Sequence, residues 1–99
     1  MPKQIIWSPL AENDFGTILE YLNQRWGIKV AYQFIEITSN LLRQIQIKPK
    51  LFPLINRKLK IRKCVLTKHD SMYYRESITQ IEILRIYDTR QDPDKLKFK

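Results

Sequence analysis

Arginine and tyrosine side chains stand among apolar ones near the end of the chain, and they are the first candidates for chemistry. Two runs with the period of β-strands, residues 71–75 and 81–87, contain Arg75, Arg85 and Tyr87. A guanidinium buried without a partner costs several kcal/mol. Arg85 stands in a largely apolar row, so it should either meet a carboxylate or line a cleft that admits an anion.

The alternation within residues 81–87 assigns the side chains to two faces. Successive side chains of a strand point to opposite sides of the sheet, which places Ile81, Ile83, Arg85 and Tyr87 on one face. The other face is expected to carry Glu82, Leu84 and Ile86.

Metal-independent cleavage of RNA is one reaction that these residue types could support. It needs a base for the 2′-hydroxyl proton, an acid for the leaving 5′-oxygen and cations on the phosphate. The candidate catalytic residues are Arg85, Tyr87, Arg75 and His69. Imidazole suits acid–base work near neutral pH, but His69 stands in a turn-like stretch, where an exposed and inert histidine is commoner.

Basic residues in the middle of the chain are candidates for binding phosphate. Lys58, Lys60 and Arg62 alternate with apolar residues, which predicts a strand with one basic face. Such a row could hold nucleic acid if nearby tyrosines stack on bases, or it could be a solvated face. The full candidate set for phosphate binding is Arg57, Lys58, Lys60, Arg62, Lys63 and Arg90.

The residues around Arg90 have a simpler interpretation. Asp88 and Asp92 flank Arg90, and Pro93 follows directly. We expect the two carboxylates to pair with the guanidinium or to cap a tight turn.

Metal and cofactor sites are not expected. The chain has one histidine, one cysteine and no pair of carboxylates at ligand spacing. Its two glycines, Gly16 and Gly27, lie outside any phosphate-binding loop pattern. Cys64 lies in an apolar run and is expected to be a small core residue.

The elements that must position these residues follow from periodicity. Residues 4–7 form a β-branched and aromatic run, and Ser8 followed by Pro9 is a typical helix start. Two segments of helical period follow, separated at Gly27 and ending near Pro49. Three strands come last, so we predict an α+β fold of order β-α-α-β-β-β, in which a helical hairpin covers one face of an antiparallel sheet.

Length and charge indicate one basic domain. The 99 residues suffice for a single core, so we predict one domain over residues 1–99 with a flexible basic tail at residues 94–99. The formal net charge of +8 favours an anionic partner. No secretion signal or membrane-spanning run is present in the sequence, and we expect a cytoplasmic protein that does not contact membranes.

The motifs as a whole resemble those of the RelE/ParE superfamily of bacterial type II toxins, from about Gln4 to Pro93. The segments that carry the resemblance, in chain order, are Trp7-Ser8-Pro9-Leu10-Ala11, Tyr21-Leu22, Arg25-Trp26-Gly27, Tyr74-Arg75, Ile81-Glu82-Ile83-Leu84-Arg85-Ile86 and Arg90-Gln91-Asp92-Pro93.

The resemblance implies a growth-inhibiting toxin that a cognate antitoxin wraps and neutralises through apolar and acidic contacts, in a hetero-oligomer. It leaves the target open. RelE-like members cleave mRNA in the ribosomal A site, whereas ParE-like members block DNA gyrase and carry no known catalytic residues. A toxin that has lost its activity and only binds its antitoxin is a third possibility. If the chain is an RNase, Arg62, Arg75 and Arg85 would stabilise the phosphate charge, and Tyr87 or His69 would transfer protons.

Overall fold

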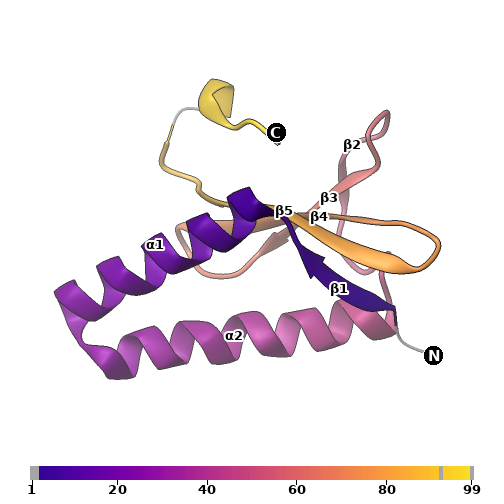
Figure 1. Ribbon diagram of the computed structural model, residues 1–99. Helices are drawn as coiled ribbons and strands as arrows, with labels where there is room; N and C mark the ends of the chain where they lie inside the picture. The colour runs from indigo at the N-terminus through magenta and orange to yellow at the C-terminus, as the bar shows by residue number, and fades with distance from the viewer. Residues whose placement is uncertain (1–2, 92, 99) are drawn as a thin grey trace.

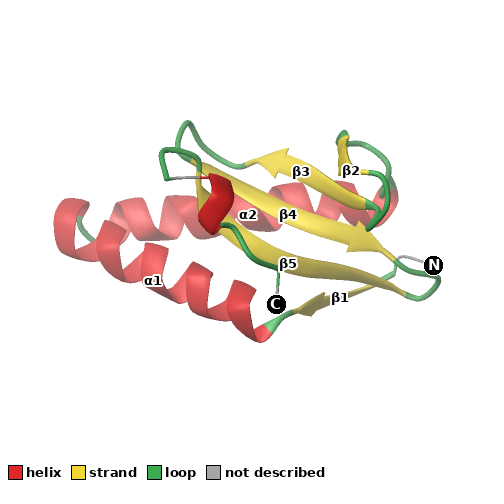
Figure 2. Cartoon of the chain, turned by 90° about the horizontal axis from the view of Figure 1, so that it is seen from above, coloured by secondary structure: helices red, strands yellow, loops and turns green. Residues whose placement is uncertain are grey.

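A helical hairpin packs along one face of a five-stranded sheet (Figures 1 and 2). The computed structural model describes residues 3–91 and 93–98. In chain order its elements are β1 (Gln4–Trp7), α1 (Pro9–Trp26), α2 (Ile28–Ile47), β2 (Leu54–Asn56), β3 (Ile61–Val65), β4 (Asp70–Glu76), β5 (Gln80–Asp88) and a short 3₁₀ helix, η1 (Pro93–Lys95). This arrangement confirms the predicted α+β class and the two-helix hairpin.

The sheet differs from the prediction in two respects. Its strand order is β1-β5-β4-β3-β2, and β1 runs parallel to β5, so the sheet is mixed rather than antiparallel. β2 is an additional edge strand that the predicted element order did not contain. Both differences depend on pairing between distant segments, which periodicity within one segment does not reveal.

Local signals set the ends of the two helices. The Ser8 side chain accepts a hydrogen bond from the backbone N–H of Ala11 at 3.0 Å, and Pro9 follows in the first helical turn. Gly27 lies between the helices with φ 97°, a conformation that suits glycine. Its N–H donates to the carbonyl of Asn23 at 3.0 Å and closes α1.

The sheet carries apolar clusters on both of its faces. The larger one lies between the helices and the sheet, and its fully buried members include Ile45, Met72, Tyr74 and Ile83. The smaller one lies on the opposite face and contains Ile61, Tyr73, Leu84 and Tyr87, with Leu96 and Phe98 packed against it.

The segment that contains Leu96 and Phe98 therefore lies on the sheet face opposite the helices (Figure 1). The flexibility that we predicted for residues 94–99 stays a prediction. Within this tail, Leu96 and Phe98 pack on the smaller cluster, and the Phe98 ring meets that of Tyr73 edge-on at 5.6 Å. The two apolar side chains of this basic tail are two positions apart, so both can pack on the cluster.

A β-bulge in the pairing of β4 with β5 overturns the predicted alternation. Tyr73 pairs with Arg85 and Tyr74 pairs with Ile83, so Leu84 is an extra residue. Ile86 consequently packs in the same cluster as Ile81 and Ile83, on the face toward the helices. The prediction that Ile81 and Ile83 share a face with Tyr87 was wrong, because one extra residue inverts the alternation beyond it.

The basic row is not a continuous strand face. Residues 57–60 form the turn that joins β2 to β3, and β3 begins only at Ile61. The Asn56 side chain accepts a hydrogen bond from the N–H of Leu59 at 2.9 Å, and Lys60 has φ 60°. An asparagine side chain that bonds the backbone in this way favours a turn over a strand.

Ser8 should contribute measurably to stability because it joins two elements. Its hydroxyl caps α1 and donates to the carbonyl of Leu84 at 2.8 Å. Ser8→Ala should lower the free energy of unfolding, measured in urea, by about 1–2 kcal/mol. Thr17→Ala on the exposed side of the same helix should change it by less than about 0.5 kcal/mol. Equal effects of the two substitutions would contradict the capping role.

Candidate functional site

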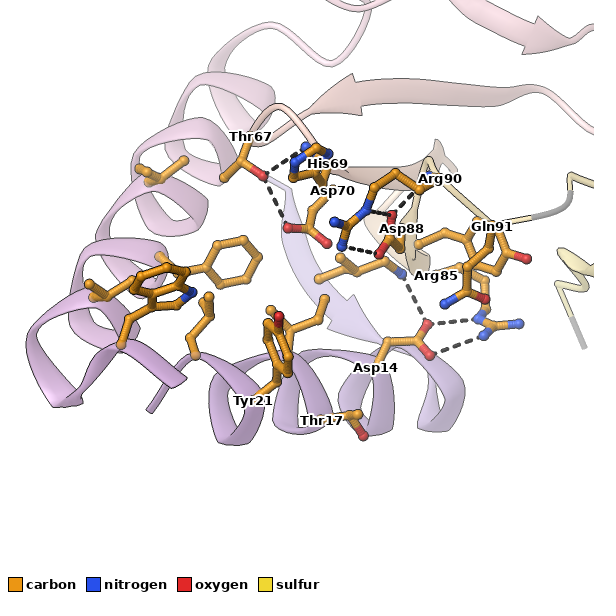
Figure 3. Close-up of a pocket in the computed structure, with 18 of the residues that line it drawn as sticks. Asp14, Thr17, Tyr21, Thr67, His69, Asp70, Arg85, Asp88, Arg90 and Gln91 are labelled. Atoms are coloured by element: carbon orange, nitrogen blue, oxygen red, sulfur yellow. Dashed lines mark hydrogen bonds and ion pairs between the residues drawn. The ribbon is translucent and has the colours of Figure 1, made fainter. Parts of the chain in front are cut away.

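A cleft of about 830 Å³ opens between the helical hairpin and the adjoining end of the sheet. Figure 3 shows its lining side chains, which come from both helices, the β3–β4 loop and the end of β5. The lining residues are Asn13, Asp14, Thr17, Ile18, Tyr21, Leu22, Trp26, Val30, Gln33, Phe34, Ile37, Thr67, His69, Asp70, Arg85, Ile86, Tyr87, Asp88, Arg90 and Gln91.

The helical wall of the cleft is apolar and open to solvent. Trp26 is 63% exposed, Tyr21 53% and Ile37 38%. Trp26 continues the apolar stripe of α1 in the sequence, but α1 extends beyond the sheet (Figure 1). The guanidinium of Arg25 lies 5.5 Å from the centre of its ring, which stays largely exposed. Large exposed apolar side chains that line one concavity are typical of a protein-binding surface.

The sheet side of the cleft is polar. Asp70 and Asp88 lie directly opposite each other on β4 and β5. Asp88 holds Arg90 by hydrogen bonds of 3.1 and 2.7 Å to the guanidinium, and it accepts the Arg90 backbone N–H at 2.8 Å. This confirms the expected pairing of Asp88 with Arg90, whereas Asp92 lies outside the described residues.

The two carboxyls differ in their environments. Asp70 accepts a hydrogen bond from the Thr67 hydroxyl at 3.0 Å, yet burial raises the pKa of its carboxyl, and the charge of Asp88 raises it further. The side-chain hydrogen bond from Arg90 lowers the pKa of Asp88. At the edge of the cleft, the hydrogen bond from Arg90 thus stabilises the Asp88 carboxylate, whereas the Asp70 carboxyl is partly desolvated.

Arg85 pairs with a carboxylate, which was one of the two environments that we predicted for its guanidinium. Its Nε and Nη2 donate to the two oxygens of Asp14 at 2.7 and 3.0 Å (Figure 3). The arginine side chain is 16% exposed and the aspartate side chain 13%. Asp14 also accepts the backbone N–H of Ile86 at 3.0 Å, so one carboxylate of α1 holds both a side chain and the backbone of β5.

Arg85 makes further contacts on the face opposite the helices. Its Nη1 donates to the carbonyl of Lys97 at 2.5 Å, and its guanidinium lies 5.9 Å from the centre of the Tyr87 ring. Tyr87 itself is only 8% exposed. The predicted pair of Arg85 and Tyr87 is therefore together, but it is built into the packing between β5, α1 and the tail.

The other predicted residues are distributed over the molecule. His69 lines the cleft, and its carbonyl accepts the N–H of Thr89 at 2.7 Å. Arg75 pairs with Glu82 at 3.3 Å near the opposite end of the sheet. Arg62 donates to the carbonyl of Phe52 at 2.7 Å. Lys63 follows Arg62 on β3, so the two side chains point to opposite faces of the sheet.

The cleft unites four of the predicted residues and adds others that the sequence did not identify. His69, Arg85, Tyr87 and Arg90 line it, whereas Arg75 and the basic residues between 57 and 63 do not. The helical wall and Asp14 went unrecognised as parts of a site. The sequence did contain a signal for the helical wall. Tyr21 and Trp26 are large aromatic residues near the end of the first helix, and no strand follows directly that could cover them.

Metal ligands do not cluster in the part of the chain that the structure describes, which contains no group of three or more His, Cys, Asp or Glu side chains able to hold an ion. Neither α1 nor α2 is long and apolar enough to cross a membrane.

A family model described as "ParE toxin of type II toxin-antitoxin system, parDE" matches residues 5–93 of the chain. No curated protein matches its sequence.

Solved structures with similar folds are toxins or toxin–antitoxin complexes by their titles. A chain of the chromosomal ParDE system of P. aeruginosa has 18% identity and a TM-score of 0.71, with 87% of this chain and 95% of that one covered. A YoeB/ParE toxin from Agrobacterium tumefaciens has 13% identity and a TM-score of 0.64, covering 86% and 96%. A chain of the RelBE2 complex of Mycobacterium tuberculosis has 14% identity and a TM-score of 0.60, covering 89% and 99%.

The pair formed by Asp14 and Arg85 should dominate the stability of this region. Arg85→Ala and Asp14→Ala should each lower the free energy of unfolding by about 3 kcal/mol, because each leaves a largely buried charge without its partner. The double variant should cost clearly less than the sum of the two. Urea unfolding of all three variants measures this coupling.

The exposed pair of Arg75 and Glu82 offers a matched control, since its side chains are 41% and 30% exposed. Arg75→Ala should cost less than about 1 kcal/mol. An Arg85→Ala variant no less stable than Arg75→Ala would show that the Asp14 contact is not structural.

Proposed function

Because the chain belongs to the family of ParE toxins of type II toxin–antitoxin systems, we propose that it acts on DNA gyrase as a binding inhibitor in the bacterial cytoplasm. A cognate antitoxin would neutralise it by occupying the cleft. One observation carries the choice of binding over RNA cleavage: three arginines of the candidate sets, Arg75, Arg85 and Arg90, are each paired with a carboxylate of the chain.

These internal partners reduce what the arginines can offer a phosphate. Arg85 is held by Asp14, Arg75 by Glu82 and Arg90 by Asp88. A carboxylate beside each guanidinium cancels most of its charge and occupies its donors, so stabilising a developing phosphorane would first require each pair to break. Asp70 and Asp88 would also repel an incoming phosphate.

Arg75 is also too far from Tyr87 for the two side chains to act on one bond. Arg75 lies opposite Glu82, whereas Tyr87 lies opposite Ser71. Five positions along β5 correspond to roughly 15 Å, whereas groups that act on one reacting centre must each come within hydrogen-bond reach of it.

RNA cleavage remains the alternative function, and one observation favours it. Arg85, Tyr87, His69 and Arg90 all line the same cleft. An RNA segment bound there could meet both an imidazole and a phenol, provided that the acidic partners of the arginines moved aside.

The target can be identified by pulse labelling after induced expression in bacteria, with thymidine and amino-acid incorporation followed separately. We expect DNA synthesis to fall within the first minutes, ahead of protein synthesis. Purified chain should likewise inhibit supercoiling by purified gyrase without shortening an mRNA on ribosomes.

The other outcomes each contradict the proposal. An early fall in protein synthesis with cut mRNA would assign the chain to the ribosome-dependent RNases, and no fall in either would indicate a toxin that has lost its activity. Arg85→Ala is a poor probe of catalysis here, because loss of its contact with Asp14 weakens the fold.

The antitoxin proposal rests on the helical wall of the cleft. The exposed side chains of Tyr21, Trp26 and Ile37 form an apolar surface beside a polar edge. An amphipathic segment could bury its apolar side against the helices and donate hydrogen bonds to Asp70 or Asp88 with its polar side. Such a segment suits the apolar contacts of the antitoxin tail that the family resemblance implies.

Ile37→Ser should weaken binding of the product of the neighbouring antitoxin gene by about tenfold, because the complex loses most of one buried aliphatic side chain. Isothermal titration calorimetry with purified proteins measures the change.

Ile47→Ser is the matched control, since Ile47 lies on the same helix, is 83% exposed and is not among the cleft residues. It should leave the affinity unchanged. Equal weakening by both substitutions would place the antitoxin elsewhere on α2.

A further inference from the structure

The net positive charge of the chain resides in one continuous segment. Residues 37–69 contain nine lysines and arginines and no acidic residue. The remaining 66 residues carry nine basic and ten acidic residues, and so have a net charge of −1. The formal charge of +8 is thus concentrated in a third of the chain.

The fold gathers the core of this segment at one edge of the sheet. Lys48 and Lys50 follow the end of α2, and Arg57, Lys58 and Lys60 belong to the turn between β2 and β3. We call these five residues the basic edge. The carbonyl of Lys50 lies 3.5 Å from the guanidinium of Arg62 on β3, which ties the two parts of the edge together. The β2 edge and the tip of the helical hairpin lie at opposite ends of the molecule (Figure 1).

The cations of the basic edge are available to a ligand, unlike the three arginines that are paired with carboxylates. All five residues are exposed. No ion pair among the described residues joins any of them to a carboxylate, whereas Arg75, Arg85 and Arg90 each have one. Exposed cations without nearby acids attract a polyanion and release its counterions on binding.

Protection of the sheet edge explains this charge less well. Edge strands commonly carry charged residues that discourage pairing with another chain. β2 itself has no charged residue, and its Leu54 and Ile55 are 41% and 47% exposed. The cations lie before and after the strand rather than within it.

We propose that the basic edge binds the phosphate backbone of duplex DNA. A single-stranded nucleic acid would require aromatic rings on which its bases stack. The only aromatic residue between positions 48 and 63 is Phe52, which packs against the main core. Cations on a protruding turn, without a stacking surface, fit a double-stranded backbone and provide contacts that do not depend on base sequence. The proposal does not depend on which target the toxin inhibits.

Binding of the full chain to a fluorescent duplex of about 20 base pairs, followed by anisotropy between about 50 and 200 mM salt, tests this proposal. Arg57→Gln/Lys58→Gln should weaken binding about tenfold or more at low salt. It should also lower the slope of log affinity against log salt concentration by about 2, since each phosphate contact contributes about 1. Lys48→Gln/Lys50→Gln, in another part of the edge, should behave similarly.

Arg25→Gln/Lys29→Gln is the matched control, because it removes one exposed arginine and one exposed lysine at the tip of the helical hairpin. It should leave the slope unchanged, and thermal unfolding should show that all three variants are folded. Slopes lowered equally by the control and the edge variants would overturn the proposal, since the attraction would then depend on net charge alone.

Two competitors test the identity of the ligand. Single-stranded RNA of the same length should compete less well than unlabelled duplex, and so should polyglutamate of matched charge. Stronger competition by the RNA would overturn the duplex assignment, and equal competition by polyglutamate would identify the edge as a site for acidic protein segments. Gyrase is absent from the assay, so a failure here leaves the proposed target untouched.

Discussion

The contact between the Asp14 carboxylate and β5 organises the structure around it. Asp14 accepts the Arg85 guanidinium and the Ile86 backbone N–H, while Ser8, one turn and a half earlier, donates to the carbonyl of Leu84. These bonds meet at the bulge, where the extra residue leaves backbone groups without regular ladder partners. The start of α1 thus satisfies the irregular part of β5 and joins the helical hairpin to the sheet.

The bulge has consequences for both faces of the sheet. Beyond the bulge, Ile86 turns toward the helices, while Arg85 and Tyr87 turn toward the tail. The hairpin continues past the sheet and leaves apolar side chains uncovered, which creates the cleft. An arginine that could have served a phosphate instead holds a helix, a strand and a tail together.

The molecule presents two chemically distinct surfaces at opposite ends. The cleft combines apolar helix residues with carboxylates at its edge, whereas the basic edge carries unpaired cations and no acid. Apolar contacts give affinity that salt hardly changes, while phosphate contacts weaken steeply with salt. Because the two surfaces do not overlap, a protein in the cleft would leave the basic edge accessible, and binding at the two sites would respond differently to solution conditions.

The sequence by itself determined the helical hairpin, the order of most elements and the family. Ser8, Pro9 and Gly27 act on their immediate neighbours, so their effects can be predicted without the fold, and the need of Arg85 for a partner followed from the cost of burying its charge. Only the tertiary structure decided that the partner is Asp14, that a bulge inverts the pattern of β5, that residues 57–60 form a turn and that the tail packs back on the sheet. These features depend on which distant segments come into contact, and neither periodicity nor capping signals carry information about such pairings.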